Sequence, residues 1–152
     1  MRAVLDSSVA VKWVLAEKDS DRARHLRDGY RQGQHALIAP DWFVAEVANV
    51  LGKAAARKTI TVAEAAQGYA DILNDAPVLH QSRVFVDAAF QLALKHQRAV
   101  YDCLYLALAF DQKCDLVTAD DSLVANCSQF MDAWYGYHPC LSDLAAPQRF
   151  LF

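Results

Sequence analysis

The chain has 152 residues, of which 55% are hydrophobic and 22% charged, the proportions of a soluble globular protein with about one domain. Its net charge of −3 at pH 7 argues against nucleic-acid binding through an overall positive surface charge, although binding through a local basic patch is still compatible with it. No apolar run reaches the ~20 residues that span a bilayer, and Asp6 interrupts the first apolar stretch before it forms a targeting segment. We therefore expect one cytoplasmic domain over residues 1–152, without a membrane partner.

The cysteines and histidines exclude several other classes of site. Four cysteines are scattered without a C-x-x-C pair, and five histidines show no paired metal-ligand spacing. Neither a zinc site nor a disulfide framework is indicated, so the thiols are expected to be reduced and inert.

Short strands and helices alternate along the chain. Apolar runs bounded by turn residues predict four strands, at residues 2–5, 36–40, 78–80 and 115–119. Apolar periodicity and end signals predict helices at residues 7–17, 19–33, 41–58, 61–74, 82–96, 101–113 and from 121 to about 130. The expected N-caps are a serine at the start of 7–17, then Asp41, Thr61, Ser82 and Asp121. An edge strand within 135–144 and an irregular tail are expected to follow.

This alternation predicts a parallel sheet covered by helices on both faces, an α/β sandwich. In such sheets, ligands bind outside the carboxyl ends of the strands. Asp6 closes the first strand, and Asp120 lies just beyond the fourth. The topology therefore brings these two carboxylates to one edge.

Two further carboxylates interrupt apolar segments. Asp102 is the one charge within residues 100–110, and Glu46 lies at the margin of an apolar helical stripe. Taken singly, each has a structural interpretation, since a first-turn Asp complements the helix dipole and a helical Glu often faces solvent. Taken together with Asp6 and Asp120, they predict an acidic cluster, whose mutual repulsion a cation such as Mg²⁺ or Mn²⁺ would relieve.

The segments 4–9, 46–51, 101–109 and 116–120 together resemble the motifs of PIN-domain ribonucleases, specifically VapC-type toxins of bacterial type II toxin–antitoxin systems. The resemblance runs from about residue 2 to about residue 130. It implies a PIN-like three-layer α/β/α sandwich around a parallel sheet of four or five short strands, with an edge strand and tail at about 131–152. It also implies a metal-dependent endoribonuclease that hydrolyses phosphodiester bonds.

The resemblance also implies roles for individual residues. Asp6, Glu46, Asp102 and Asp120 form the family's acidic quartet, binding one or two Mg²⁺ or Mn²⁺ ions. Three supporting positions match the family's pattern, namely Thr118, Ser8 and Asn49, and Asp121 is kept as a further candidate beside Asp120. Thr118 is expected to hydrogen-bond the cluster. For Ser8 and Asn49, a helix-start hydroxyl and an interior amide bond are equally good interpretations.

Asp121 follows Asp120 directly, so either can be the fourth ligand. The resemblance favours Asp120, and Asp121 suits a helix N-cap. The tail at 134–152 is longer than the family usually shows, and it either extends a dimer contact or trails off.

The partners implied are an RNA substrate, a second copy of the chain in a homodimer, and a VapB-type antitoxin. An apolar groove around Trp13, Val14, Trp42 and Phe43 would accept an antitoxin segment, although ordinary core packing explains these residues too.

Two non-catalytic alternatives remain. A phosphoacceptor receiver also places aspartates at strand ends, but it needs a late Lys, and none follows Lys113. The other alternative is a degenerate PIN module that only binds its partners. Against it, all four positions of the acidic quartet are occupied by Asp or Glu in this chain.

Overall fold

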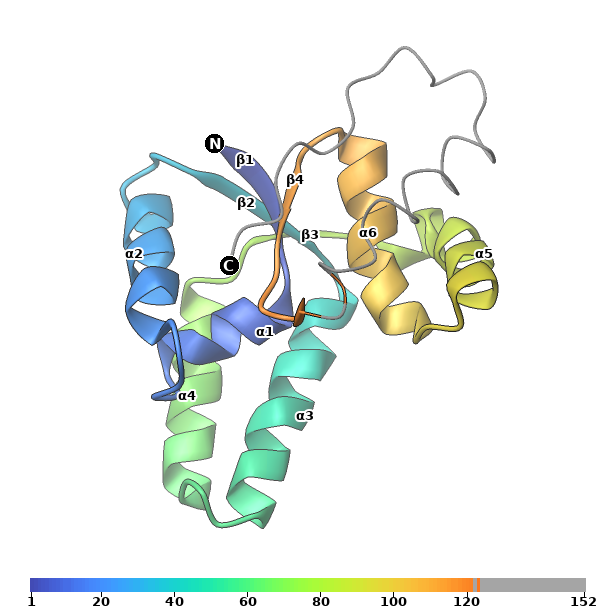
Figure 1. The fold of residues 1–152 in the computed structure, drawn as a ribbon. Coiled ribbons are helices and arrows are strands. Elements are labelled where there is room, and N and C mark those ends of the chain that lie inside the picture. The colour runs from blue at the N-terminus through green and yellow to red at the C-terminus, as the bar shows by residue number, and fades with distance from the viewer. Residues whose placement is uncertain (122, 124–152) are drawn as a thin grey trace.

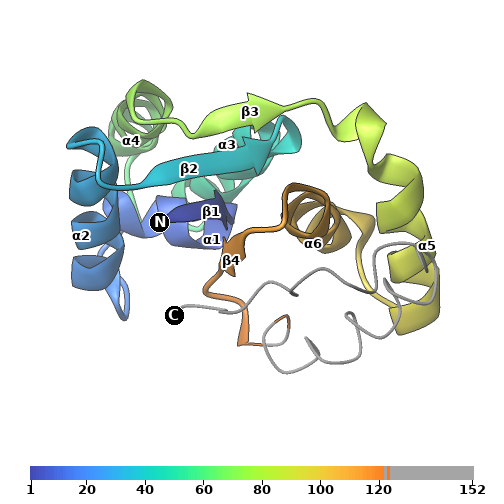
Figure 2. The same cartoon turned by 90° about the horizontal axis from the view of Figure 1, so that it is seen from above.

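The computed structural model describes residues 1–121 and 123. Within them, four parallel strands form one sheet in the order β3-β2-β1-β4, and Figure 2 shows them side by side. The strands are β1 (Arg2–Leu5), β2 (Ala36–Pro40), β3 (Val78–His80) and β4 (Asp115–Val117). The four predicted strands are thus confirmed, with the last ending at Val117 rather than at residue 119.

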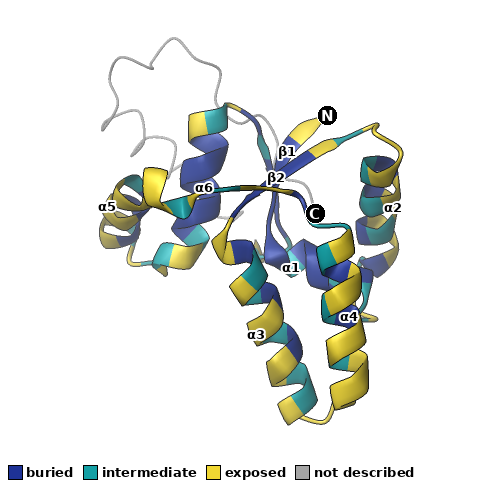
Figure 3. Cartoon of the chain, turned by 180° about the vertical axis from the view of Figure 1, so that it is seen from behind, coloured by how far each residue is buried: buried dark blue, intermediate teal, exposed yellow. Residues whose placement is uncertain are grey.

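Helices cover both faces of this sheet. They are α1 (Ser7–Ala10), α2 (Ser20–Arg31), α3 (Trp42–Ala56), α4 (Val62–Asn74), α5 (Val86–His96) and α6 (Val100–Gln112), with 3₁₀ turns η1 (Val11–Trp13) and η2 (Ser82–Val84). Figures 1 and 3 show α5 and α6 on one side of the sheet, α1 and α2 on the other, and the α3–α4 pair extending beyond it. The expected three-layer α/β/α sandwich is confirmed.

The pairing of β1 with β4 determines which residues lie side by side at the carboxyl ends of these two strands. Leu5 pairs with Val117, and the next amide, that of Asp6, donates to the carbonyl of Val117 at 3.0 Å. The ladder therefore continues one residue past both strands. As a consequence, Asp6 and Thr118 leave the sheet next to each other.

Of the five predicted N-caps, one was right and four were wrong, the fourth being Asp121, whose place Asp120 takes. Thr61 and Glu64 form the expected capping box at the start of α4. The first helix is capped by Asp6 rather than by a serine, and it gives way to η1 after only four residues.

Asp41 and Ser82 do not cap the helices that follow them. Instead, Asp41 Oδ1 accepts the amide of Ser82 at 3.1 Å, so the two residues tie the start of α3 to the chain after β3. Ser82 opens η2, and the helix expected from 82 begins as α5 at Val86. A contact between segments 41 residues apart has no signature in local sequence.

Helix α6 is the central helix of the core. Its residues from Cys103 to Phe110 are all buried, because the helix packs on the sheet and α5 packs against its outer side, as Figure 3 shows by colour. No helix among the described residues is long and apolar enough to cross a membrane. The helix predicted to run to about 130 and the edge strand within 135–144 lie largely or wholly outside the described residues.

Candidate active site

Four acidic side chains come from four different elements toward the carboxyl ends of β1 and β4. Asp6 follows β1, Glu46 lies on α3, Asp102 lies in the first turn of α6, and Asp120 follows β4. Electrostatic repulsion links Asp6 to Asp120, Glu46 to Asp6 and Asp102, and Asp102 to Asp120. The structure therefore brings the four predicted residues into one electrostatic cluster.

Asp6 is the buried member of this acidic cluster, with a relative exposure of 7%. Its Oδ1 accepts the amide of Ser8 at 3.0 Å, and its Oδ2 accepts the hydroxyl of Thr118 at 2.5 Å. Burial raises the pKa of Asp6, the hydrogen bonds from Thr118 and Ser8 partly oppose that rise, and repulsion by Asp120 adds to it. Asp6 is thus held in position by two hydrogen bonds, while burial and the charge of Asp120 disfavour its ionised form.

Thr118 and Ser8 connect the two strand ends around Asp6. The fully buried Thr118 also accepts the amide of Asp120 at 3.1 Å through its Oγ1. The Ser8 hydroxyl accepts the amide of Ala119 at 3.0 Å. Both side chains therefore shape the loop that carries Asp120.

Glu46 has a hydrogen-bond partner that the sequence reasoning missed. The hydroxyl of Tyr105 donates to Glu46 Oε2 at 2.5 Å, across 59 residues of sequence. Burial raises the pKa of Glu46 most, the bond from Tyr105 lowers it, and repulsion by Asp6 and Asp102 raises it further. Burial also raises the pKa of Tyr105 well above 10, so its hydroxyl remains a donor. The available signal was a Tyr three residues after Asp102, hence on the same helical face.

Asp102 does more than complement the dipole of α6. Burial is the largest cause that raises the pKa of Asp102, and repulsion from Asp120 and Asp6 raises it further, whereas the positive charge of Arg98 lowers it. A residue serving only the helix terminus would not interact with carboxylates from β1 and β4. The charge within the apolar segment 100–110 is therefore explained by the cluster that it joins.

Asp120 and Asp121 differ clearly in their surroundings. Asp120 is half-buried, interacts with Asp6 and Asp102, and accepts the amide of Leu123 at 3.3 Å through Oδ1. Asp121 is exposed. The expectation that Asp121 is the N-cap was wrong, because Asp120 makes the capping bond.

Asn49 lies on α3, three residues beyond Glu46, and its side chain is exposed. An interior amide bond is therefore not its role. Of the supporting residues, Ser8 and Thr118 contact the cluster through hydrogen bonds.

The donor chemistry of the acidic cluster suits a hard divalent cation. Every donor is a carboxylate oxygen, which Mg²⁺ and Mn²⁺ prefer, and three of the four carboxylates have pKa values raised by burial and repulsion. Within residues 1–121 and 123, no three Asp, Glu, His or Cys side chains are arranged to ligate one ion directly. Since Mg²⁺ keeps several waters and uses only one or two carboxylates, the cluster fits an ion held partly through water.

A cysteine nucleophile has no support at this site. Cys103 follows Asp102 but is buried and free. Burial, with the nearby charge of Asp102, raises its pKa to about 12. At neutral pH its thiolate is therefore negligible.

The aromatic and apolar residues expected near a groove separate into two groups. Trp13 and Phe43 belong to the core, whereas Trp42 is exposed. A hollow of about 760 Å³ does lie between the segment 14–17 that follows η1, the second half of α3 and the residues just before α4, and Val14, Val50, Ile60, Lys53 and Arg57 are among its lining residues. Of the four residues predicted to form a groove, only Val14 lines this hollow.

The fold and the acidic edge together define a parallel α/β domain whose first strand lies between the second and fourth. A receiver-type fold places β1 between β2 and β3, so the observed pairing of β1 with β2 and β4 excludes that alternative. The chain matches the PIN domain family over residues 3–127, and it belongs to that family.

Solved structures agree on the fold. The crystal structure of PAE2754 from Pyrobaculum aerophilum is similar with a TM-score of 0.63 and 21% sequence identity, covering 82% of this chain and 86% of that one. No curated protein matches the chain in sequence. The PIN domain is a nuclease fold, and the acidic cluster lies at the edge of the sheet where such folds bind ligands.

Proposed function

We propose that this PIN domain is a Mg²⁺- or Mn²⁺-dependent endoribonuclease that acts as the toxin of a VapC-type toxin–antitoxin pair. The observation that carries the nuclease proposal is the electrostatic coupling of Asp6, Glu46, Asp102 and Asp120, which come from four separate elements. Carboxylates crowded without a compensating cation are costly for a fold, so their convergence points to a cation that balances them.

Each residue then has a defined task. Asp6, Glu46, Asp102 and Asp120 would hold a divalent ion, directly or through water. When bound, such an ion would make an activated water available near neutral pH and would stabilise charge at the scissile phosphate. Thr118 and Ser8 fix Asp6 and the Asp120 loop, and Tyr105 orients Glu46. No side-chain nucleophile is required.

Cleavage of RNA in the presence of different cations tests this proposal. The purified chain should cut RNA in Mg²⁺ or Mn²⁺ and stop after chelation, and Asp102→Asn should reduce the rate by about 100-fold or more, as expected when an essential charge is removed. Asp111→Asn is the matched control, because Asp111 is an exposed carboxylate near the opposite end of α6. Equal rates for the parent and Asp102→Asn would contradict the proposal.

A second pair of variants distinguishes the two adjacent aspartates. We expect Asp120→Asn to lose cleavage and Asp121→Asn to retain it, because Asp120 interacts with the other carboxylates while Asp121 is exposed. The reverse result would make Asp121 the fourth ligand.

The toxin role, the homodimer and the VapB-type antitoxin rest on the resemblance of the sequence motifs to VapC-type toxins. The 760 Å³ hollow supports a place for an antitoxin segment, because its lining includes both apolar Val14, Val50 and Ile60 and the cations of Lys53 and Arg57. Expression of the chain should arrest growth, and co-expression of the antitoxin should restore it. Light scattering of the isolated chain should give twice the monomer mass.

A degenerate PIN module that binds RNA without cutting it makes a different prediction. It would bind the same RNA with no cleavage in Mg²⁺ or Mn²⁺, and Asp102→Asn would leave binding intact or strengthen it by removing a negative charge.

A further inference from the structure

Two exposed aromatic rings lie stacked at the rim of the acidic cluster. The rings of Trp42 and Tyr101 have centroids 4.6 Å apart and an interplanar angle of 9°. Trp42 is nevertheless 36% exposed and Tyr101 50% exposed. The pair therefore presents apolar ring surface to solvent rather than being buried in the core.

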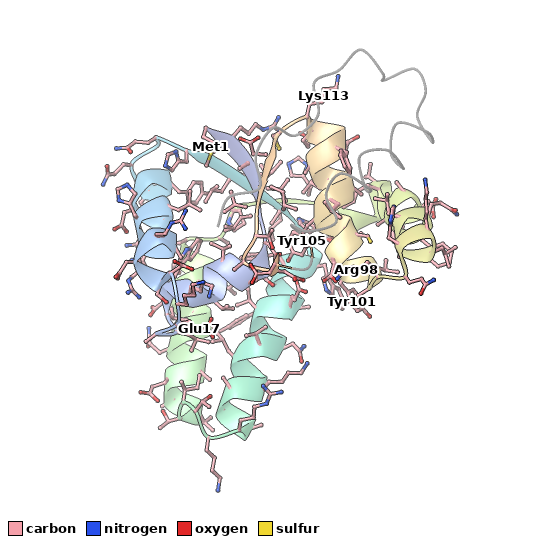
Figure 4. The ribbon with its side chains drawn as sticks, viewed as in Figure 1. Met1, Glu17, Arg98, Tyr101, Tyr105 and Lys113 are labelled. Atoms are coloured by element: carbon pink, nitrogen blue, oxygen red, sulfur yellow. The ribbon has the colours of Figure 1, made fainter. Side chains whose placement is uncertain are left out.

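The position of the stack relates it directly to two of the carboxylates. Trp42 is the first residue of α3, one helical turn before Glu46, and Tyr101 immediately precedes Asp102 on α6. Figure 4 shows Tyr101 beside Arg98 at the start of α6, with Tyr105 further along the same helix. The aromatic stack and the acidic cluster thus share the starts of α3 and α6.

The acidic cluster creates a specific problem for substrate binding. Its carboxylates repel the phosphates of RNA, and an ion can offset this only at the phosphate it contacts. Further binding energy has to come from groups insensitive to that repulsion. Stacking of a base on an aromatic ring is such an interaction, and it is the usual way in which unpaired bases are held.

We propose that the Trp42–Tyr101 stack is the platform for an unpaired nucleobase next to the scissile phosphate. The proposal rests on the nuclease function proposed above and adds to it a residue pair that selects unpaired bases. Every base has an aromatic face, so the platform selects strand state more than sequence.

The stack also joins α3 to α6, so a purely structural role must be distinguished from base binding. If the stack is only a structural clamp, removing it would displace Glu46 and Asp102 and weaken binding of any ligand, with or without bases. A base platform would matter only when a base is present. A matched pair of oligomers separates these roles.

The binding experiment compares a fluorescein-labelled 12-residue oligouridylate with the same ribose–phosphate chain lacking bases. Both are titrated by fluorescence anisotropy in Ca²⁺, which occupies oxygen-ligand sites, and gels confirm that the oligomers stay intact. Trp42→Ala and Tyr101→Ala should weaken binding of the oligouridylate about 5- to 100-fold, with less than about twofold change for the abasic chain. Trp42→Phe and Tyr101→Phe should restore most of the affinity, because they keep a ring.

Phe90→Ala is the matched control, since Phe90 on α5 is 47% exposed but stacks on no ring within residues 1–121; it should bind both oligomers like the parent. Equal effects of Trp42→Ala on both oligomers would show a clamp and overturn the proposal. So would a parent that binds both oligomers equally or binds neither. Loss of antitoxin binding in Trp42→Ala, with RNA affinity unchanged, would identify a protein contact instead and also overturn it.

Cleavage in Mg²⁺ separates this proposal from the nuclease function. Under the platform, Trp42→Ala raises the KM for RNA with a smaller change in kcat, because the base contact is made in the ground state as well as the transition state. A parent that binds through the stack but does not cut would refute the nuclease and leave the platform standing. A parent that cuts, with a KM unchanged in Trp42→Ala, would do the opposite.

Discussion

Thr118 Oγ1 and Asp6 Oδ2 are joined by a hydrogen bond of 2.5 Å, across 112 residues of sequence and between the ends of neighbouring strands. The contact follows from the sheet register, because Leu5 pairs with Val117 and the next residues, Asp6 and Thr118, therefore lie side by side where the two strands end. Thr118 is completely buried and Asp6 nearly so. A lost donor at this position therefore cannot be replaced easily by solvent.

Thr118→Val removes this donor at nearly constant volume. We expect the free energy of unfolding at pH 7 to fall by about 1–3 kcal/mol, the cost of a buried acceptor left without its partner. Because the bond from Thr118 lowers the pKa of Asp6, the loss should be smaller in acid, where Asp6 is protonated. Urea denaturation measures both, and Thr118→Ser, which keeps the hydroxyl, should stay closer to the parent. If Thr118→Val and Thr118→Ser lose the same free energy of unfolding, the effect is due to packing rather than to the hydrogen bond.

Tyr105→Phe tests the bond to Glu46 without opening a cavity. Since that bond lowers the pKa of Glu46, its removal should move the pKa of Glu46 still higher and weaken cation binding at slightly acidic pH. The acid limb of the pH–rate profile should therefore shift to higher pH, while the rate at alkaline pH changes much less. Tyr69→Phe on α4 is the control, and a profile that coincides with the parent's would remove Tyr105 from the site.

The sheet and the acidic edge were predictable because they depend on local pattern and general topology. Short apolar runs between amphipathic segments predict parallel strands, and the carboxyl ends of such strands share an edge. Asp6 and Asp120 could therefore be placed together without coordinates. Glu46 and Asp102 could be assigned only from the joint pattern of all four carboxylates, since each has an ordinary helical interpretation when considered alone.

What sequence reasoning missed are contacts between helices whose mutual positions the local pattern does not specify. The bond of Tyr105 to Glu46 and the stacking of Trp42 on Tyr101 both join α3 to α6. Asp41 resembled a helix cap, but the fold places Ser82 beside it. In each case, a tertiary partner changed the role that local propensity suggested.

Thr61→Ala tests the one N-cap that the sequence predicted correctly. The hydroxyl of Thr61 accepts the amide of Glu64 at 3.1 Å, and Glu64 Oε2 accepts the amide of Thr61 at 2.7 Å. Loss of the cap should cost about 0.5–2 kcal/mol of stability, with no change in the rate of RNA cleavage, because α4 contributes no residue to the acidic cluster. Thr61→Ser should restore stability, and a changed cleavage rate would link α4 to the site.

Asp102→Asn should have opposite effects on stability with and without a divalent cation. The pKa of Asp102 is raised in the folded state by burial and by Asp120 and Asp6, so the folded chain binds this proton more tightly than the unfolded chain does. Its stabilising effect is therefore complete below the unfolded pKa, near 3.8, and is lost as the pH rises through the folded value. At pH 7, the ionised carboxylate destabilises the cation-free protein.

In EDTA at pH 7, Asp102→Asn should therefore melt above the parent by a few degrees, since ~1 kcal/mol shifts a domain of this size by about 2–4 °C. The difference should shrink toward pH 4, where the parent carboxyl protonates. Millimolar Mg²⁺ should raise the melting temperature of the parent more than that of the variant, because a ligand stabilises in proportion to its affinity for the folded state. Asp111→Asn, which removes an exposed charge outside the acidic cluster, should show neither effect. If Asp102→Asn melts below the parent in EDTA, Asp102 is not under the repulsion that makes the cluster a cation site.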